Sequence, residues 1–466
     1  LRATTYYVSP SGNDSNNGTS ILTPWKTISK VDQSAYIFQP GDQILFQRGG
    51  KYYGQFTAGN SGTSTLPITI SDYGTGELPI ISGCKIITNW SLHQGNIWKA
   101  TLSEKPTQVY VNDSRVIPAR QPNFGNYYVN TQASGNQLYS TDLTQSNGYW
   151  NGCRISIRCT ASSVDTIRIS SYSNGTLTLS SNPSNSNMGN EPWGFFITGK
   201  LELLDSPNEW FWDSSTNQLY IWVQNNQNPN NLVVEASVYN TGIILPWMRH
   251  HFTISNIHFE KQTYAGVEFS AAYNSTIQNC IFDRGYFGIR NYGSNNSFIN
   301  NTIKNTYATG ILSIIQDPNE STLIEGNTLT NIARFIGEGE SFWGYMGIRC
   351  VGNNTTIRLN RLDSIGYTAI ECGGNQLVEK NVIKNSMLTL NDGGGIAFDN
   401  ADGLIIQDNI ISNIIGSFEA IIGPQESDVR YNTGIYFGNT SIKNTTVQRN
   451  TITQTAVGIN VDHTMI

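Results

Sequence analysis

One short phrase decides the fold of this chain: an apolar residue, one or two further residues, and then asparagine. A second phrase, a small residue followed by an apolar one, recurs in step with it from Gly266-Val267 to Gly458-Ile459. The base period is about 22 residues, and such repeats of short β-branched segments with Asn and Gly turns predict a solenoid. The first phrase occurs as Ile254-Ser-Asn256, Ile277-Gln-Asn279, Ile299-Asn-Asn301, Ile324-Glu-Gly-Asn327, Ile357-Arg-Leu-Asn360, Val378-Glu-Lys-Asn381, Ile406-Gln-Asp-Asn409 and Val447-Gln-Arg-Asn450.

The kind of solenoid follows from the residues of the repeat. A leucine-rich repeat has a similar period, but it needs a Leu-x-x-Leu-x-Leu frame that this chain lacks. In a parallel β-helix each coil adds short strands to parallel sheets, and stacked Asn side chains can hydrogen-bond between coils. The pattern therefore predicts an all-β protein built on a parallel β-helix.

Composition excludes several classes of partner. The 466 residues include 28 Lys and Arg against 34 Asp and Glu, a net charge of -6. Nucleic-acid-binding surfaces normally show clustered positive charge, so we expect no nucleic-acid partner. No apolar run approaches the ~20 residues of a membrane span, and we expect no membrane partner.

The repeats resemble the right-handed parallel β-helix of the pectate-lyase-like superfamily of carbohydrate-active proteins. The N-terminal phrases Tyr6-Tyr-Val-Ser-Pro-Ser-Gly-Asn-Asp14, Pro24-Trp-Lys-Thr-Ile28 and Pro40-Gly-Asp-Gln-Ile-Leu-Phe46 resemble the cap and first coil of the same group. The resemblance covers residues 5–84 and about 245–466. It implies a polysaccharide or oligosaccharide as partner and a secreted, periplasmic or cell-surface location.

Residues 85–245 interrupt the repeats and hold most of the tryptophans. We therefore expect three parts: an N-terminal cap with the first coils (1–84), an inserted β-sandwich-like domain (85–245) and the main β-helix with the active-site groove (246–466). The phrases Gln108-Val-Tyr-Val-Asn-Asp113 and Glu209-Trp-Phe-Trp-Asp213 resemble an inserted domain of β-helix glycoside hydrolases with β-xylosidase or α-L-fucosidase activity.

Strand parity selects the first candidate site residues. Alternate residues of a strand face the core, so the residue after each small-apolar phrase faces outward. This places Arg349 and Glu371 on one surface in successive coils. In the next coil Ala397 follows the phrase, and Asp399, two positions beyond Ala397, faces outward as well. Two registers are open: Glu371 lies opposite Asp399, or the two are offset by two residues, with backbone separations of roughly 5 or 8 Å.

Asp392 is a candidate from its turn. Asn391-Asp-Gly-Gly-Gly-Ile396 resembles the Asp-Gly-Gly/Ala-Ile-Tyr phrase of the β-helix hydrolases, in which the Asp belongs to the catalytic set. The match is incomplete because Ala397 stands in place of the Tyr. Asp in a glycine-rich turn can also serve backbone capping alone.

Two insertions next to these coils predict the walls of a cleft. The insertion at 334–345 carries Glu338, Glu340 and Trp343, and the one at 414–431 carries Glu419, Glu426 and Asp428. Loops on a rigid scaffold commonly carry function. We expect catalytic roles for Asp392, Glu371, Asp399 and Glu419, and substrate contacts from Arg349, Trp343, Glu340, Tyr345 and Tyr367.

The leading hypothesis is a glycoside hydrolase that uses a pair of carboxylates, with the acid from Asp392 or Glu419 and the anion from Glu371 or Asp399. One alternative is a polysaccharide lyase acting on a uronate-containing glycan, for which Lys380 and Lys384 are candidate bases. The other is a non-catalytic glycan-binding β-helix. We expect no metal site and no cofactor. A structural calcium ion is the one alternative, and no clear motif in the sequence supports it.

The C-terminal residues 457–466 lie within a repeat and contain no recognisable cap. The open end of a solenoid exposes strand edges and core. We therefore expect a further C-terminal segment or a partner surface to cover this end.

Overall fold

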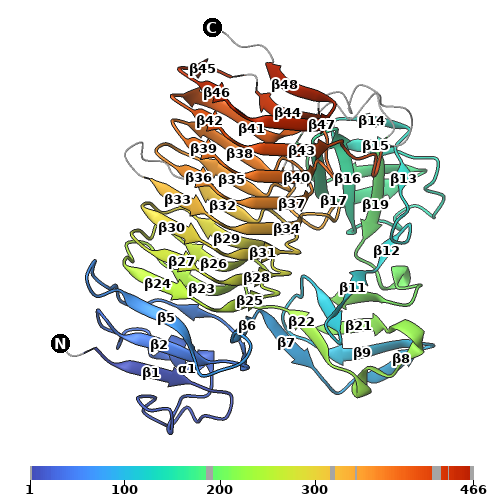
Figure 1. Cartoon of the computed structure of the whole chain (residues 1–466). Helices are drawn as coiled ribbons and strands as arrows, with labels where there is room; N and C mark the ends of the chain where they lie inside the picture. Colours follow the sequence, from blue (N-terminus) through green and yellow to red (C-terminus); the bar gives the residue numbers. More distant parts are fainter. Residues whose placement is uncertain are drawn as a thin grey trace.

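The protein, described from a computed structural model, contains a long stack of coils flanked by a separate β-rich part (Figure 1). The structure describes residues 3–184, 193–314, 321–341, 344–421, 432–438 and 440–461. Each coil contributes strands to three parallel sheets, and the chain climbs from the N-terminal to the C-terminal coil. The predicted parallel β-helix is confirmed.

Each sheet takes one strand from nearly every coil. Sheet 1 contains β1 (Thr5–Val8), β2 (Gln43–Gln47), β5 (Ile68–Tyr73), β24 (Phe252–Ser255), β27 (Thr276–Gln278), β30 (Asn296–Ile299), β33 (Thr322–Glu325), β36 (Thr356–Arg358), β39 (Leu377–Glu379), β42 (Ile405–Gln407) and β46 (Thr446–Gln448). Sheet 2 contains β3 (Lys51–Tyr53), β6 (Ile80–Ser82), β25 (His258–Glu260), β28 (Ile281–Asp283), β31 (Thr302–Lys304), β34 (Thr328–Ile332), β37 (Arg361–Ile365), β40 (Val382–Ser386), β43 (Ile410–Ile414) and β47 (Thr451–Thr455). Sheet 3 contains β4 (Phe56–Thr57), β23 (Thr241–Leu245), β26 (Ala265–Phe269), β29 (Phe287–Asn291), β32 (Ile311–Ile314), β35 (Ile348–Val351), β38 (Ile370–Gly374), β41 (Gly393–Asp402), β44 (Asn432–Phe437) and β48 (Val457–Val461), with β45 (Ile442–Lys443) beside β41.

A ladder of asparagines joins the coils between sheets 1 and 2, as the repeats predict. Each Asn of the ladder before the last donates both its side-chain amide and its backbone N–H to the Oδ1 of the next, at 2.9 to 3.0 Å. These bonds satisfy polar groups that would otherwise be buried without partners. The ladder comprises Asn301, Asn327, Asn360, Asn381, Asn409 and Asn450.

Asn256 and Asn279 do not belong to this ladder, which corrects the sequence alignment of the repeats. Both adopt left-handed backbone, with φ of 56° and 54°, and so occupy the turn position just before the ladder. The backbone N–H of Cys280 accordingly donates to Oδ1 of Asn301. A short Asn side chain suits either position, because it tolerates left-handed φ and also bonds between coils.

The insert begins at β7 (Cys84–Ile87) and ends with β22 (Val234–Ser237), while β23, which lies within the predicted insert, already belongs to sheet 3. Its two eight-stranded sheets each have their own hydrophobic cluster, around Val109 and Ile155 respectively. One sheet contains β7, β22, β10 (Val109–Val111), β11 (Ser114–Pro118), β20 (Glu209–Asp213), β21 (Gln218–Trp222), β9 (Ile97–Thr101) and β8 (Ser91–Gln94). The other contains β12 (Arg120–Gln121), β19 (Gly194–Thr198), β16 (Arg154–Thr160), β17 (Ser163–Ser173), β18 (Thr176–Leu179), β15 (Gln137–Tyr139), β14 (Gln132–Ser134) and β13 (Tyr128–Val129).

Helical structure in the described residues is short. It comprises α1 (Ile28–Gln33), which lies in the N-terminal part, and the 3-10 turns η2 (Leu201–Leu203), η3 (Gln224–Asn226) and η4 (Pro229–Asn231) of the insert. None of these has the length and apolar character that a membrane-crossing helix requires.

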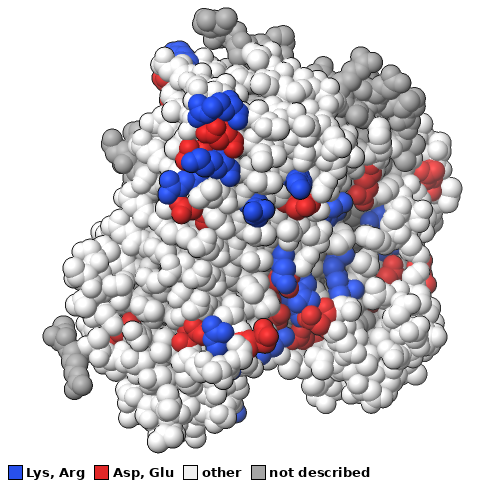
Figure 2. All heavy atoms as spheres, in the orientation of Figure 1, with Lys and Arg blue, Asp and Glu red and all other residues white. Residues whose placement is uncertain are grey.

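Charged side chains of both signs gather where the lower coils meet the insert (Figure 2). Nζ of Lys261, which is fully buried, lies 2.5 Å from Glu235 and 2.6 Å from Asp113, both carboxylates of the insert. Lys51 bridges Glu235 at 2.6 Å and Glu260 of the β-helix at 2.7 Å. This network joins the insert to the β-helix.

Candidate active site

The outward row of sheet 3 has the register that strand parity predicts. Arg349 lies opposite Glu371, and Glu371 lies opposite Ala397. Asp399 lies opposite Gly373, so the structure selects the offset register, with backbones of Glu371 and Asp399 about 8 Å apart. The full row runs through Glu268, Arg290, Leu312, Arg349, Glu371, Ala397, Tyr436 and Asn460.

Three of the four predicted catalytic carboxylates line one small pocket. Glu371, Asp392 and Asp399 contribute to a cavity of about 60 Å³ on the outer face of sheet 3. Ala397 belongs to the same lining, in the row between Glu371 and Tyr436. The remaining lining residues are Met346, Tyr367, Thr368, Gly393, Phe398, Tyr436 and Gly438.

Asp392 is held in a turn with left-handed backbone, at φ of 61°. The hydroxyl of Tyr367 donates to its backbone carbonyl at 2.6 Å, and the hydroxyl of Tyr436 lies 3.5 Å from its Oδ1. Gly393 is required next to it, since a Cβ there would lie 2.8 Å from Oγ1 of Thr368. Tyr367, a predicted substrate contact, is 5% exposed and therefore mainly positions the Asp392 turn.

Glu371 is largely covered, with 11% of its side chain exposed, and forms an ion pair with Arg349. Burial raises the pKa of Glu371, and the Arg349 guanidinium opposes this without cancelling it.

Asp399 is partly exposed at the end of the pocket. Its Oδ1 accepts a hydrogen bond from the hydroxyl of Thr440 at 3.1 Å. The carboxylate packs directly on Gly438, where any Cβ would collide with it. The side chain is thus held in place while part of its surface faces solvent.

Glu340 lies beside the same row. Its Oε2 accepts a hydrogen bond from the hydroxyl of Thr309 at 2.9 Å. Burial raises the pKa of Glu340, whereas Thr309 and the nearby Arg349 lower it. A contact between Glu340 and substrate remains a prediction.

Glu419 does not line this pocket. Its Oε1 accepts a hydrogen bond from the Tyr127 hydroxyl of the insert at 2.6 Å. Its backbone carbonyl accepts from Nη1 of the fully buried Arg158 at 2.7 Å, and the same Nη1 donates to the carbonyl of Thr389 at 3.0 Å. Glu419 is therefore part of the contact between insert and β-helix, and its predicted role as the acid loses its geometric support.

The other candidates from the two insertions lie elsewhere. Tyr345 is fully buried and its hydroxyl accepts a hydrogen bond from the backbone N–H of Gly337 at 3.0 Å, so it shapes the loop and cannot reach a ligand in this conformation. Glu338 pairs with Arg115 of the insert. Trp343, Glu426 and Asp428 lie outside the described residues.

Two features of the site were not identified from the sequence. Thr368 lines the pocket beside Tyr367, and Arg158 ties the insert to the carbonyl of Thr389, three residues before Asp392. Arg158 also donates to the carbonyl of Ala161, which in turn accepts from the backbone N–H of Asn391. No local sequence pattern signals such contacts, because they join segments about 230 residues apart.

Comparison with known proteins supports the fold. Residues 197–337 match the family described as Periplasmic copper-binding protein (NosD). Eighty residues are 44% identical to a lacto-N-biosidase of Bifidobacterium longum subsp. longum, which is 16% of this chain and 5% of that protein. The chain therefore spans only a small part of that curated relative.

Two solved structures share the architecture. A chain described as a glycoside hydrolase has 15% sequence identity and a TM-score of 0.71, covering 99% of this chain and 96% of that chain. The structure of XylC in complex with xylose has 15% identity and a TM-score of 0.56, covering 95% of this chain and 69% of that chain. At this identity the likeness bears on the fold.

The described part of the chain contains no group of three or more His, Cys, Asp or Glu side chains that could hold a metal ion. The confirmed fold is a parallel β-helix with a large inserted β part.

Proposed function

We propose that this protein is a glycoside hydrolase acting on an oligosaccharide or polysaccharide. One observation carries the proposal: Glu371, Asp392 and Asp399 line one pocket whose described lining contains no Lys or Arg. Glycosidases require two carboxyl groups flanking the scissile bond, one protonated and one ionised. The similarity to a lacto-N-biosidase, and the likeness to a structure described as a glycoside hydrolase, support this reading.

In the proposed mechanism Asp392 is the acid and Asp399 the anionic partner. Asp392 would protonate the glycosidic oxygen, and Asp399 would attack the anomeric carbon or activate a water molecule. We assign the anion to Asp399 because its carboxylate is partly exposed and accepts a hydrogen bond from the Thr440 hydroxyl, which orients it in the pocket. Glu371 is more deeply covered and is paired with Arg349, which suits a group that orients substrate and shapes the local charge.

The lyase alternative has less support from the geometry. Lys384 lies in β40 of sheet 2, opposite Asp363, and Lys380 precedes that strand. Neither lysine lines the pocket, which leaves the reaction without the predicted base there. A secreted or periplasmic location remains part of the proposal, supported by the periplasmic description of the matched family.

The test is a panel of 4-nitrophenyl glycosides and oligosaccharides, including lacto-N-biose and xylose derivatives. Release of 4-nitrophenol or new reducing ends would support the hydrolase. Formation of unsaturated uronate would show a lyase instead, and binding without turnover across the panel would favour a glycan-binding protein.

The same panel tests the assignment of Asp392. Asp392→Asn should lower turnover by about 100-fold or more, because the general acid is lost. The matched control is Asp402→Asn. Asp402 is an exposed aspartate at the end of β41, the strand that begins directly after Asp392. Comparable activity of the two variants, with circular dichroism unchanged, would remove Asp392 from the mechanism.

A further inference from the structure

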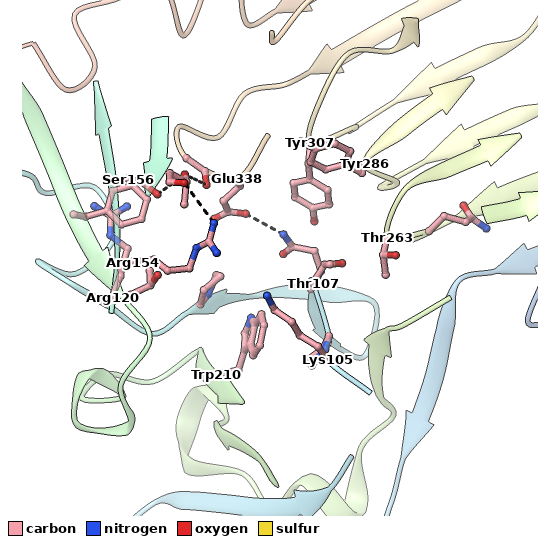
Figure 3. A pocket seen from close by; sticks show the side chains of 18 residues that line it. Lys105, Thr107, Arg120, Arg154, Ser156, Trp210, Thr263, Tyr286, Tyr307 and Glu338 are labelled. Atoms are coloured by element: carbon pink, nitrogen blue, oxygen red, sulfur yellow. Dashed lines mark hydrogen bonds between the residues drawn. The ribbon is translucent and has the colours of Figure 1, made fainter. Parts of the chain in front are cut away.

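A second and larger pocket lies between the insert and the β-helix (Figure 3). Its volume of about 330 Å³ is at the lower end of the ~300–1,000 Å³ typical of small-molecule sites. The insert supplies Arg120 and Trp210, and the β-helix supplies Tyr286, Tyr307 and Glu338. It shares no lining residue with the pocket of Asp392.

The lining carries an excess of positive charge. Lys105, Arg120 and Arg154 line the pocket, and Glu338 is the one acidic residue among its described lining residues. Glu338 is already neutralised, since it pairs with Arg115 and accepts a hydrogen bond from Nε2 of Gln108 at 3.2 Å. An anionic group entering the pocket would therefore meet three cations and one acidic residue that is already paired.

Arg120 is a fixed charge and not a mobile surface arginine. Its Nε donates to the carbonyl of Pro122 at 2.9 Å and its Nη2 to that of Asn126 at 2.6 Å. The guanidinium carbon lies 3.5 Å from the ring centroid of Phe196, which also lines the pocket. Because the side chain is already ordered, an anion bound near it would pay little further ordering entropy.

Trp210 supplies an unused donor. It is 8% exposed, and its Nε1 has no hydrogen-bond partner within the part of the chain that the structure describes. A buried donor left unpaired costs about 1–3 kcal/mol, which an acceptor on a ligand would recover. Figure 3 shows Trp210 and Lys105 on one side of the pocket and Tyr286, Tyr307 and Glu338 on the other.

We propose that this pocket is a second carbohydrate-binding site and that it takes a carboxylate-bearing sugar. The aromatic side chains provide apolar faces for a sugar ring, Trp210 and Gln108 provide polar contacts, and the cations provide the counter-charge for the carboxylate. The proposal does not rest on the proposed hydrolase activity, since binding here involves none of the residues assigned to the reaction.

Calorimetric titration of the whole chain with D-glucuronate, D-glucose and inorganic phosphate tests the chemistry. We expect glucuronate to bind, and glucose to bind at least about tenfold more weakly because it lacks one charge-assisted hydrogen bond. Phosphate should also bind at least about tenfold more weakly, because it has no sugar ring to contact the aromatic side chains. Equal binding of glucose would overturn the acidic-sugar assignment, and equal binding of phosphate would replace it with a simple anion site. No glucuronate binding up to about 10 mM would overturn the proposal.

Variants locate the binding. Trp210→Phe keeps an aromatic ring, although a smaller one, and removes the N–H, and Arg154→Ala removes an exposed cation, so each should weaken glucuronate binding by about three- to tenfold. The matched controls are Trp222→Phe, whose Nε1 bonds to Asn226, and Arg168→Ala, an exposed arginine on β17 outside the pocket. Asp392→Asn should bind glucuronate as the wild type does. Weakening by the controls, or by Asp392→Asn, would place the ligand elsewhere and overturn the assignment.

Discussion

Nε of Arg349 lies 2.7 Å from Oε2 of Glu371, across one step of the outward row of sheet 3. The guanidinium favours the ionised carboxylate, while burial of Glu371 favours the protonated form and is the larger effect. The protonation of Glu371 therefore depends on two opposing influences, burial and the Arg349 guanidinium. Substitution of Arg349 removes the second.

Arg349→Met should raise the pKa of Glu371 further. The loss of the positive charge destabilises the carboxylate, so the proton is released only at higher pH. NMR titration of 13C-labelled glutamate side chains measures this directly. Arg361→Met, an exposed arginine of β37 in sheet 2, is the control and should leave the Glu371 titration in place. An unchanged or lowered Glu371 pKa in Arg349→Met would contradict the account.

Ala397→Trp should block the candidate active site without unfolding the protein. Ala397 lies in the row between Glu371 and Tyr436 and lines the pocket, so an indole there would fill a cavity of about 60 Å³. We expect turnover of any active substrate to fall by about 100-fold, since the reacting groups can no longer meet it. Ile244→Trp, at the other end of the same row, should retain activity. Equal activity of both variants would show that the pocket is not where substrate binds.

Much of the candidate site could be predicted from the repeats. Residues at the same place in successive repeats lie next to one another in the same sheet. In a β-helix one coil is one step of the sheet, so the parity of Arg349, Glu371 and Asp399 was enough to place them on one surface. The register between Glu371 and Asp399 could not be chosen, because both alignments keep that parity. Asn256 and Asn279 were misaligned for a related reason: asparagine suits the turn position as well as the ladder position beside it.

Contacts made by the insert were beyond the reach of sequence. Arg158 reaches the carbonyls of Thr389 and Glu419, and Tyr127 reaches the Glu419 carboxylate, across more than 230 residues of chain. Such contacts depend on how the insert docks, which no periodicity encodes. Glu419 therefore looked catalytic as a loop carboxylate, while the structure gives it a partner in the insert.

Lys261→Met should loosen the docking of the insert. Lys261 is fully buried, and its loss leaves the Glu235 carboxylate buried with fewer counter-charges. Removal of one partner from a buried ion pair typically costs about 3–5 kcal/mol of unfolding free energy. Urea denaturation measures the loss, with the exposed Lys443→Met as control. A loss below about 1 kcal/mol would mean that Lys51 and Arg284 compensate for the missing charge.

Glu209→Gln should change how stability depends on pH. Glu209 is 3% exposed, accepts the backbone N–H groups of Asp205 and Ser206 at 3.2 Å each, and has its pKa raised to about 7, mainly by burial. Because the folded state holds this proton more tightly than the unfolded state, the wild type should lose stability as pH rises from about 4.5 to about 7. Glutamine keeps the acceptor oxygen but carries no charge. Over that pH interval the unfolding free energy of the variant should therefore rise relative to that of the wild type, by up to about 3 kcal/mol. Urea midpoints measured across this pH range test the slope, and Glu77→Gln, an exposed carboxylate, should leave it unaltered. A stability difference between Glu209→Gln and the wild type that stays constant from acid to neutral pH would show that folding does not raise the pKa of Glu209.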